Sequence, residues 1–245
     1  MTKNSSKIAL SIIVPVLNEE EGIEKTITEL FKDLKKESIK SLINSFEIIV
    51  INDGSWDNTD KVLKKIKKSY PIIKIITHKI NQGLGAALLS GVRHSSKTYI
   101  TYLPADGQVF LREIPKGLKL APFADLVLTY RGERADYNAY RNLLSGTLTT
   151  FMKLFFKLNF KDYNWVHIYK KSLFDHVKIK SKGVFYLGEV IIRTQKAGFK
   201  ILEAEADYHP RSTGHSKNAR IYVVLNTLKD LLKLWIELKL SPHLK

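Results

Sequence analysis

The chain has 245 residues, of which 44% are hydrophobic and 26% charged, and these proportions are typical of a folded globular protein rather than a disordered one. It contains no cysteine, which excludes disulfide bonds, thiolate metal sites and cysteine nucleophiles. The formal net charge of +16 indicates an anionic partner, such as nucleic acid, a membrane surface or a phosphorylated substrate, or else a lysine-rich solvated surface.

The first half of the chain alternates between buried strands and helices. Runs rich in β-branched residues predict strands at 8–16, 46–53, 72–78 and 98–105. The intervening segments space their apolar residues as helices do, from Asn18 onward, over 54–69 and over 81–95. Three glutamates after Asn18 would then lie in a first helical turn, where the helix dipole favours acids. This alternation predicts an α/β fold with a parallel, doubly wound sheet.

The second half is more mixed. We predict a strand at 124–131, an amphipathic helix at 140–158, a strand passing into a helix at 166–177, a helix at 186–199, an extended segment at 200–210 and a helix at 221–240. No uncharged apolar stretch reaches about 18 residues, and the first residues lack the cleavage pattern of a signal peptide. We therefore expect a protein that is not integral to a membrane.

Polar residues follow the predicted strands of the first half. Glu19 follows the first strand, Asp53 the second, and Asp106 the fourth, in the stretch "YLPADGQVF". Ligands of such sheets sit at the carboxyl ends of the strands, where carboxylates accept ribose hydroxyls or base N–H groups and bind Mg²⁺ or Mn²⁺. The glycine-rich helix start at Gly83 and Gly85 lets a ligand approach the backbone. Each residue also has a structural interpretation as a turn or cap residue, but their joint occurrence favours a ligand site.

Four segments resemble the family 2 glycosyltransferases with the GT-A fold: "SIIVPVLNEEEGI", "EIIVINDGSWDNT", "NQGLGAALLSGV" and "YLPADGQV". Their order and spacing match the nucleotide-sugar half of that family over residues 8–130. The resemblance implies a Rossmann-like, mainly parallel sheet flanked by helices, with a nucleoside-diphosphate sugar as donor. The donor-binding residues that it implies are Pro15, Leu17, Glu19, Asp53, Gly83 and Gly85. It also implies that Asp106 and Gln108 hold Mg²⁺ or Mn²⁺ on the diphosphate.

Two later segments narrow the resemblance to polyprenyl-phosphate glycosyltransferases of the dolichol-phosphate mannosyltransferase type. These segments are "TYRGERADYNAYRNLLS" at 129–145 and "PRSTGHSK" at 210–217. By resemblance, the residues that hold the lipid phosphate are Arg131, Arg141, Ser145, Arg211, Ser216 and Lys217. The implied reaction is inverting transfer of a hexose from GDP-mannose or a UDP-sugar to polyprenyl or dolichyl phosphate. The acceptor phosphate is already anionic, so this reaction needs no general base.

The sequence departs from the family pattern in three places. Pro104 stands where the family usually has an aspartate, and Asn52 stands where the first aspartate of Asp-Asp-Gly-Ser is common. The segment "DYNWVHIYKK" at 162–171 lacks the Ser-Gly-Phe often found there. Asp106 would therefore hold the metal with one carboxylate, helped by Gln108.

We expect a GT-A domain at 1–220, with its nucleotide-sugar half at 8–130 and its acceptor half at 131–220, followed by an amphipathic helix at 221–245 that associates with a membrane or another copy of the chain. Phenylalanines and lysines alternate near residues 143–160, as in interfacial helices. These features predict a cytoplasmic protein, peripheral at the cytoplasmic face of an anionic membrane, with a homo-oligomer possible. The alternatives are a transferase with a soluble or polysaccharide acceptor, and a degenerate binding module without activity. Nucleic acid is not expected as a partner, because aromatic residues do not cluster on a basic strand.

Overall fold

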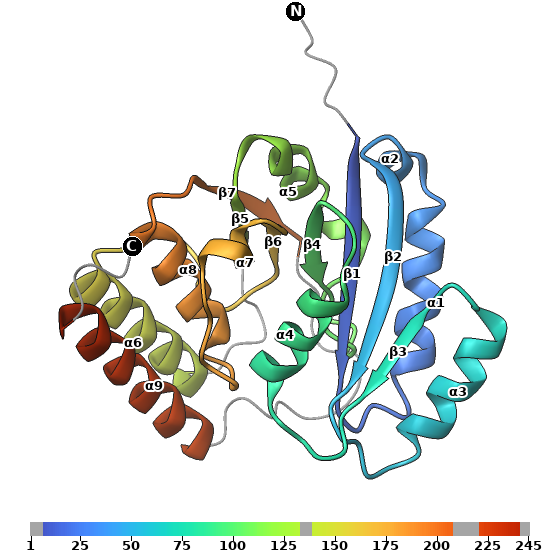
Figure 1. The fold of residues 1–245 in the computed structure, drawn as a ribbon, viewed down its shortest axis with the longest axis horizontal. Coiled ribbons are helices and arrows are strands. Elements are labelled where there is room, and N and C mark those ends of the chain that lie inside the picture. The colour runs from blue at the N-terminus through green and yellow to red at the C-terminus, as the bar shows by residue number, and fades with distance from the viewer. Residues whose placement is uncertain (1–6, 133–138, 208–220, 241–245) are drawn as a thin grey trace, which may run out of the picture.

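The computed structural model describes residues 7–132, 139–207 and 221–240. Within these residues the strands form one seven-stranded sheet in the order β3-β2-β1-β4-β6-β5-β7 (Figure 1). The strands are β1 (Ile8–Val16), β2 (Ile43–Asn52), β3 (Lys74–Thr77), β4 (Tyr99–Tyr102), β5 (Leu126–Arg131), β6 (His167–Lys170) and β7 (Ile201–Ala206). β6 pairs antiparallel with β4 and β5, and the other pairings are parallel. The mainly parallel sheet is confirmed; the reversed strand was not predicted.

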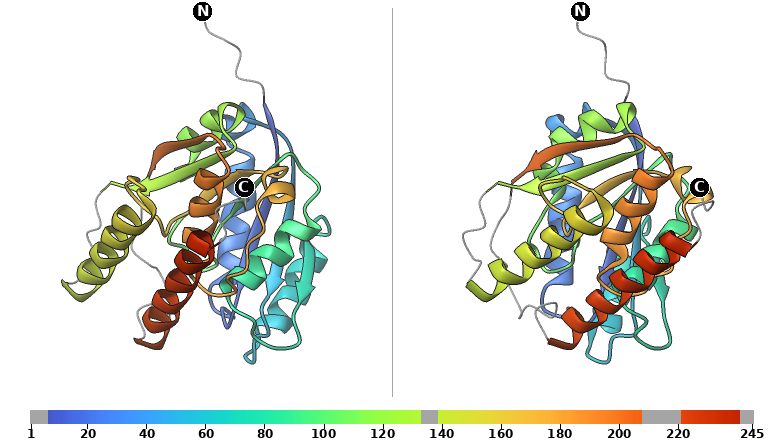
Figure 2. Two further views of the ribbon diagram at one scale, coloured as in Figure 1. Left: turned by 60° about the vertical axis from the view of Figure 1, so that its left-hand side comes forward. Right: turned by 90° about the vertical axis from the view of Figure 1, so that its left-hand side faces the viewer.

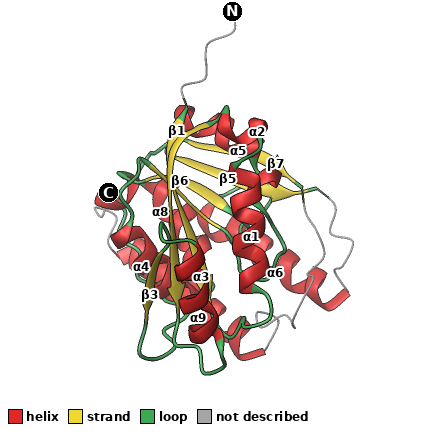
Figure 3. Ribbon diagram, turned by 90° about the vertical axis from the view of Figure 1, so that its right-hand side faces the viewer, coloured by secondary structure: helices red, strands yellow, loops and turns green. Residues whose placement is uncertain are grey.

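Helices cover both faces of the sheet. They are α1 (Ile23–Leu34), α2 (Glu37–Lys40), α3 (Thr59–Ser69), α4 (Leu84–His94), α5 (Pro115–Leu120), α6 (Ala139–Phe156), α7 (Leu173–His176), α8 (Tyr186–Lys196) and α9 (Ile221–Leu240), with short 3₁₀ turns at Leu111–Glu113 and Ala121–Phe123. α1 and α3 lie on one face, and α4 and α8 lie on the other (Figures 1 and 3). The sheet is thus buried between two helical layers, which explains why its central strands are continuously apolar.

α6 and α9 lie side by side at one end of the molecule (Figure 2). Phe155 of α6 meets the edge of Trp235 of α9, with ring centroids 5.4 Å apart. No helix in the described ranges combines the length and the apolar character needed to cross a bilayer.

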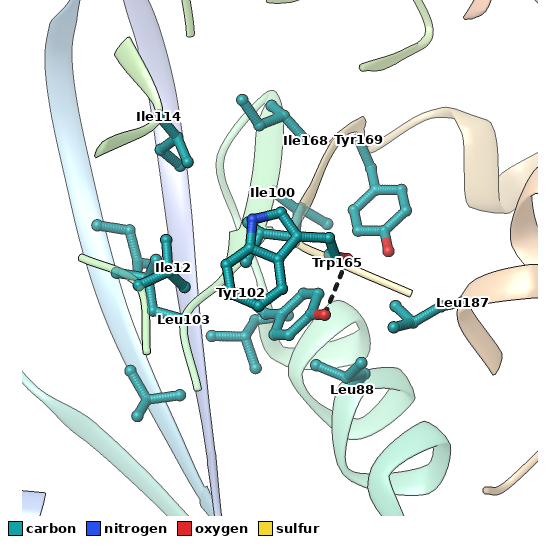
Figure 4. Close-up of a cluster of buried hydrophobic side chains, with 14 of the residues drawn as sticks. Ile12, Leu88, Ile100, Tyr102, Leu103, Ile114, Trp165, Ile168, Tyr169 and Leu187 are labelled. Carbon is teal, nitrogen blue, oxygen red and sulfur yellow. Dashed lines mark hydrogen bonds between the residues drawn. The ribbon is translucent and has the colours of Figure 1, made fainter. Parts of the chain in front are cut away.

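The hydrophobic core extends from the sheet to Trp165, in the segment just before β6. Ile12 of β1, Ile100 of β4 and Ile168 of β6 pack with Trp165, which precedes β6 (Figure 4). The hydroxyl of Tyr102 donates a hydrogen bond of 3.0 Å to the carbonyl oxygen of Trp165. The segment before β6 is therefore anchored at the end of β4.

The largest departures from the predicted elements lie at the start of the first helix and after β4. The first helix begins at Ile23 and not at Asn18, because Asn18 has φ +52° and the segment after β1 is bonded to the loop after β2. The glutamates at 19–21 therefore precede the helix. The turns and α5 between residues 111 and 123 were not predicted.

Candidate active site at the carboxyl edge of the sheet

The four strands β1, β2, β3 and β4 run parallel, so the loops that follow them lie at the same edge of the sheet. Val16 is in register with Asn52, Asn52 with Thr77, and Ile13 with Tyr102. β1 runs from top to bottom in Figure 1, so these loops lie toward the bottom of that view. The predicted convergence of the loops is confirmed.

The loops after β1 and β2 support one another through hydrogen bonds. The amide of Asn18 donates to Ser55 Oγ at 3.0 Å, and the amide of Trp56 donates to Asn18 Oδ1 at 3.0 Å. The amide of Glu19 donates to Thr59 Oγ1 at 2.9 Å. Glu19 is therefore fixed through its backbone at the edge of the sheet, with a half-buried side chain.

Asp53 organises the third loop. Its carboxylate is buried and accepts hydrogen bonds from the amides of Gln82 at 3.0 Å and Gly83 at 2.8 Å. His78 Nδ1 lies 2.7 Å from Asp53 Oδ1, and His78 Nε2 lies 2.9 Å from Ser90 Oγ. The imidazole thus links Asp53 to α4. The predicted contact of Asp53 with a nucleoside stays a prediction.

The glycine-rich helix start is closely approached by the segment before α8. A Cβ on Gly83, where φ is +98°, would lie 2.6 Å from the carbonyl oxygen of Lys182. A Cβ on Gly85 would lie 2.5 Å from the carbonyl oxygen of Ser181. The amide of Ala86 also donates to the Lys182 carbonyl at 3.1 Å. Glycine is required here because the chain's own backbone occupies the space of a side chain.

Asp106 lies in the turn after β4. Its side chain is buried, and Oδ1 accepts a hydrogen bond of 3.1 Å from the amide of Gln108. Thr26 of α1 donates to the carbonyl of Ala105 at 2.8 Å and holds this turn on the first helix. Pro104 is half-buried beside it.

The donor set at this turn fits a cation carried by a diphosphate. The described residues include no group of three or more His, Asp or Glu side chains that would form a metal centre alone. The carboxylate of Asp106 and the side-chain carbonyl of Gln108 are oxygen ligands that suit a hard divalent ion. Phosphate and water oxygens would supply its other ligands. The predicted role of Asp106 and Gln108 as metal ligands stays a prediction.

Arg131 and Asp162 form a buried pair beside Trp165. Nε and Nη2 of Arg131 donate to the two carboxylate oxygens of Asp162 at 2.8 and 3.2 Å. The guanidinium lies over the Trp165 ring, 4.4 Å from its centroid. Burial raises the pKa of Tyr102, and the charge of Arg131 opposes this rise while those of Asp162 and Asp106 add to it. Tyr102 thus lies within electrostatic range of both the predicted metal ligand and the predicted phosphate ligand.

Sequence reasoning did not single out Asp162, Trp165 or His78. Residues 162–166 reach the carboxyl edge only because β6 is reversed, so the segment that precedes it ends where the other strands end. No short-range signal in the sequence pointed to Asp162, which lies 31 positions after Arg131. His167 is the first residue of β6. Its burial lowers its pKa to about 3, and the charge of Asp162 opposes this shift.

The remaining predicted residues fall into three groups. Pro15 and Leu17 are half-buried at the end of β1. Arg141 and Ser145 lie on α6, where the described residues do not include their side chains. Arg211, Ser216 and Lys217 lie outside the described residues. Their predicted contacts with a lipid phosphate stay predictions.

Two curated proteins of similar sequence are named as glucosyltransferases. A dolichyl-phosphate beta-glucosyltransferase of Trichomonas vaginalis is 31% identical over 157 residues, which cover 61% of this chain and 49% of that protein. A bactoprenol glucosyl transferase of Shigella phage SfX is 33% identical over 130 residues, covering 51% of this chain and 40% of that protein. The chain spans between 31% and 52% of the length of the curated relatives that it matches here.

Solved structures of similar fold come from two further enzymes. Glucosyl-3-phosphoglycerate synthase of Mycobacterium tuberculosis, in complex with Mn²⁺, UDP-glucose and phosphoglyceric acid, superposes with a TM-score of 0.69 at 16% identity, covering 93% of this chain and 80% of that one. A mannosyltransferase of Pyrobaculum calidifontis with GDP-mannose and Mn²⁺ has a TM-score of 0.65 at 14% identity, covering 96% of this chain and 66% of that one.

The model of one protein family matches the chain over its β-sheet core. Described as glycosyl transferase family 2, it matches residues 11–174, which is more than half of the chain. This range includes the four carboxyl-edge loops and the pair formed by Arg131 and Asp162. The chain therefore belongs to glycosyl transferase family 2, with the GT-A fold that its motifs predicted.

Proposed function

We propose that the protein is an inverting glycosyltransferase that moves a hexose from a nucleoside-diphosphate sugar to a polyprenyl phosphate. The observation that carries this proposal is that the end of β4 leads both to the Asp106 carboxylate, in the turn that follows, and, through the hydrogen bond from Tyr102 to Trp165, to the buried Arg131–Asp162 pair. The first suits the diphosphate of a donor and the second suits the phosphate of an acceptor. The names of the relatives with lipid-phosphate acceptors support the same acceptor class.

The donor occupies the loops after β1 to β4 in this proposal. Glu19 and Asp53, with Pro15 and Leu17, contact the nucleoside, and Gly83 and Gly85 shape the start of α4 beneath it. Residues 8–130 thus form the nucleotide-sugar half, and residues 131–220 form the acceptor half. GDP-mannose and UDP-sugars are both compatible with these groups.

Asp106 and Gln108 would hold Mg²⁺ or Mn²⁺, which neutralises charge on the leaving nucleoside diphosphate when bound. Mn²⁺ in the solved structures of similar fold supports a divalent ion of this kind. Burial of Asp106 keeps water away from the carboxylate and strengthens its interaction with a cation.

The acceptor phosphate binds at Arg131 in this proposal. Asp162 accepts from Nε and Nη2 of Arg131 and, with Trp165, holds the guanidinium in one orientation, in which its positive charge favours an anionic phosphate nearby. A phosphate oxygen attacks the anomeric carbon, the bond from that carbon to the diphosphate breaks, and the nucleoside diphosphate leaves with the electron pair. The sugar is thereby transferred with inversion, and no proton has to be removed from the nucleophile.

Transfer to a lipid requires contact with a membrane surface. We propose that α6 and α9 make this contact from the cytoplasmic side and that the protein is peripheral. Both helices expose apolar residues, among them Leu154 on α6 and Leu232 on α9. Lysines of the same helices would meet anionic lipid headgroups.

The test is transfer in detergent with purified protein, polyprenyl phosphate and radiolabelled GDP-mannose, UDP-glucose or UDP-N-acetylglucosamine. We expect lipid-extractable label from one donor with Mn²⁺ or Mg²⁺ and none with a chelator. Asp106→Asn should lower transfer on the order of a hundredfold or more, because it removes the charged metal ligand. Asp60→Asn is the matched control, since Asp60 pairs with Lys64 on the surface of α3. No product with any donor and either metal would refute the proposal.

A soluble phosphorylated or polysaccharide acceptor is the alternative. Phosphoglyceric acid in a solved structure of similar fold favours testing a soluble phosphate. Arg141→Ala discriminates between the acceptor classes. Unchanged activity without lipid dependence would favour the soluble acceptor, whereas loss of transfer to lipid phosphate supports the proposal.

A further inference from the structure

α9 is tied to α8 by ion pairs. Glu237 of α9 lies between two cations, with Oε1 3.0 Å from Arg193 Nη2 and Oε2 2.9 Å from Lys180 Nζ. Arg193 lies on α8, and its Nε donates to Glu189 Oε1 at 2.7 Å. A charge on the last helix is thus connected to Glu189 through one guanidinium.

Glu189 connects this ion-pair chain to backbone. Its side chain is buried, and Oε2 accepts hydrogen bonds from the amides of Lys180 at 3.1 Å and Ser181 at 2.7 Å. A buried carboxylate is unfavourable unless all its neighbours are in place, so this arrangement holds residues 180 and 181 in one position. Lys180 contributes twice, with its amide to Glu189 and its ammonium group to Glu237.

The segment held by Glu189 is the one that presses on the glycine-rich turn. The carbonyl of Lys182 accepts from the amide of Ala86, and Gly83 and Gly85 leave no space between α4 and residues 181–183. The amide of Gly83 in turn donates to Asp53 at 2.8 Å. Close-packed contacts of this kind transmit a small displacement instead of absorbing it.

We propose that α9, through Glu237, Arg193 and Glu189, positions segment 180–183 and thereby sets the nucleotide affinity of the glycine-rich turn. Glu189 and Arg193 are positioning residues, since they act on the turn through that segment. The identity of the ligand as a nucleoside diphosphate rests on the proposed function. A membrane surface that alters the docking of α9 would alter donor binding through the same contacts. By linkage, donor binding would alter the affinity of α9 for that surface by the same factor.

The experiment compares the unaltered protein with Glu237→Gln, which removes the charge from α9 and keeps the side-chain size. Amide exchange at Lys180, Ser181 and Ala86 reports the position of the segment, and calorimetric titration with UDP and GDP in the presence of Mn²⁺ reports affinity. We expect exchange at the three amides to rise, and the dissociation constant to rise, by about three- to tenfold. Glu189→Gln should have at least the same effect, and the double variant should not add to it.

Glu205→Gln is the control. Glu205 lies on β7, and its Oε2 forms a surface ion pair with Lys116 Nζ, also at 3.0 Å, which the substitution removes. It should change neither readout. Unchanged exchange at the three amides in Glu237→Gln, or raised exchange with unchanged affinity, would overturn the inference. Absence of nucleotide binding by the unaltered protein would instead overturn the proposed function, and the exchange data would still decide whether α9 positions the segment.

Discussion

Arg131 and Asp162 show how one residue pair combines stability with a proposed role in binding. The side chains are only 5% and 3% exposed, two hydrogen bonds join them, and the guanidinium lies over the Trp165 ring. A buried pair gains its Coulomb energy against a large desolvation cost, so its net contribution to stability is small. Removal of one partner lowers stability strongly, because the other charge then stays buried without a counter-charge.

We predict that Asp162→Ala lowers the free energy of unfolding by about 3–5 kcal/mol. Urea unfolding followed by circular dichroism measures this change. The double variant Arg131→Met, Asp162→Ala should be more stable than Asp162→Ala alone, because the uncompensated guanidinium is removed with its partner. A loss below about 0.5 kcal/mol in the single variant would contradict the buried pair.

Asp53 marks the limit of sequence reasoning at the residue scale. Its position at the end of a strand followed from the hydrophobic run before it. Its partners did not, because His78, Gln82 and Gly83 lie 25 to 30 positions later and reach it only after β3 pairs with β2. A carboxylate that orders a neighbouring loop and one that binds a nucleoside look the same in sequence.

At the scale of elements, the start of α4 is constrained by the segment before α8. An alanine in a helix is normally more stable than glycine by about 1 kcal/mol. At Gly85 we predict the opposite, because the new Cβ would lie 2.5 Å from the Ser181 carbonyl and 2.8 Å from Tyr186 Cβ. Gly85→Ala should destabilise the protein by about 1–3 kcal/mol and lower Tm by several degrees.

Gly146→Ala provides the matched comparison, since Gly146 lies within α6 and a Cβ there has no neighbour within 4 Å. This variant should keep or raise Tm in a thermal melt. Equal changes in the two variants would mean that helix propensity alone decides both sites.

The amino-terminal half of the sheet is held by Glu47 of β2. Its carboxylate accepts from Ser11 Oγ of β1 at 2.7 Å, Lys74 Nζ of β3 at 2.7 Å and Ser96 Oγ at 2.9 Å. Burial raises its pKa, but the hydrogen bonds from Lys74, Ser11 and Ser96 outweigh burial and lower the pKa to about 2. The carboxylate therefore stabilises the fold above pH 4.5, and this contribution is lost as the pH falls from 4.5 toward 2.

We predict that Glu47→Gln lowers stability at pH 7 by about 1–3 kcal/mol and flattens the loss of stability between pH 4.5 and 2. Urea unfolding at a series of pH values measures both effects. Glu37→Gln, on the exposed side of α2, should leave the pH profile as it is. A Glu47→Gln profile parallel to that of the unaltered protein would refute the assignment.

The strands that were predicted well are those with long, continuously apolar sequences, such as β1 and β2. β6 has four residues, and its sequence "HIYK" indicates a strand without indicating direction. Its reversal depends on pairing with β4 and β5, which lie far away in the chain. The start of α1 was missed for a similar reason, since bonds to residues 55–59 hold the preceding glutamates out of the helix.

At the scale of the molecule, the exposed side of α9 combines apolar and basic residues. Leu225, Leu232, Ile236 and Leu240 are exposed and recur at intervals of seven and four, so they share one face of the helix. Three exposed lysines border this face, at positions 229, 233 and 239. The buried Leu231 and Leu234 lie on the opposite side, toward the protein. With a net charge of +16, this composition is typical of a helix that lies on an anionic membrane.

We predict that the protein sediments with vesicles containing anionic phosphatidylglycerol and much less with phosphatidylcholine alone, and that added salt weakens binding. Leu232→Ser with Ile236→Ser should reduce binding about tenfold or more, because each side chain is about half exposed in the free protein and its removal forfeits roughly 1 kcal/mol of apolar burial in the interface. Ile72→Ser is the matched control, since Ile72 is 52% exposed, close to the 51% of Leu232, but lies before β3. If the double variant binds as the unaltered protein does, α9 does not face lipid, and its exposed face then serves contact with another chain.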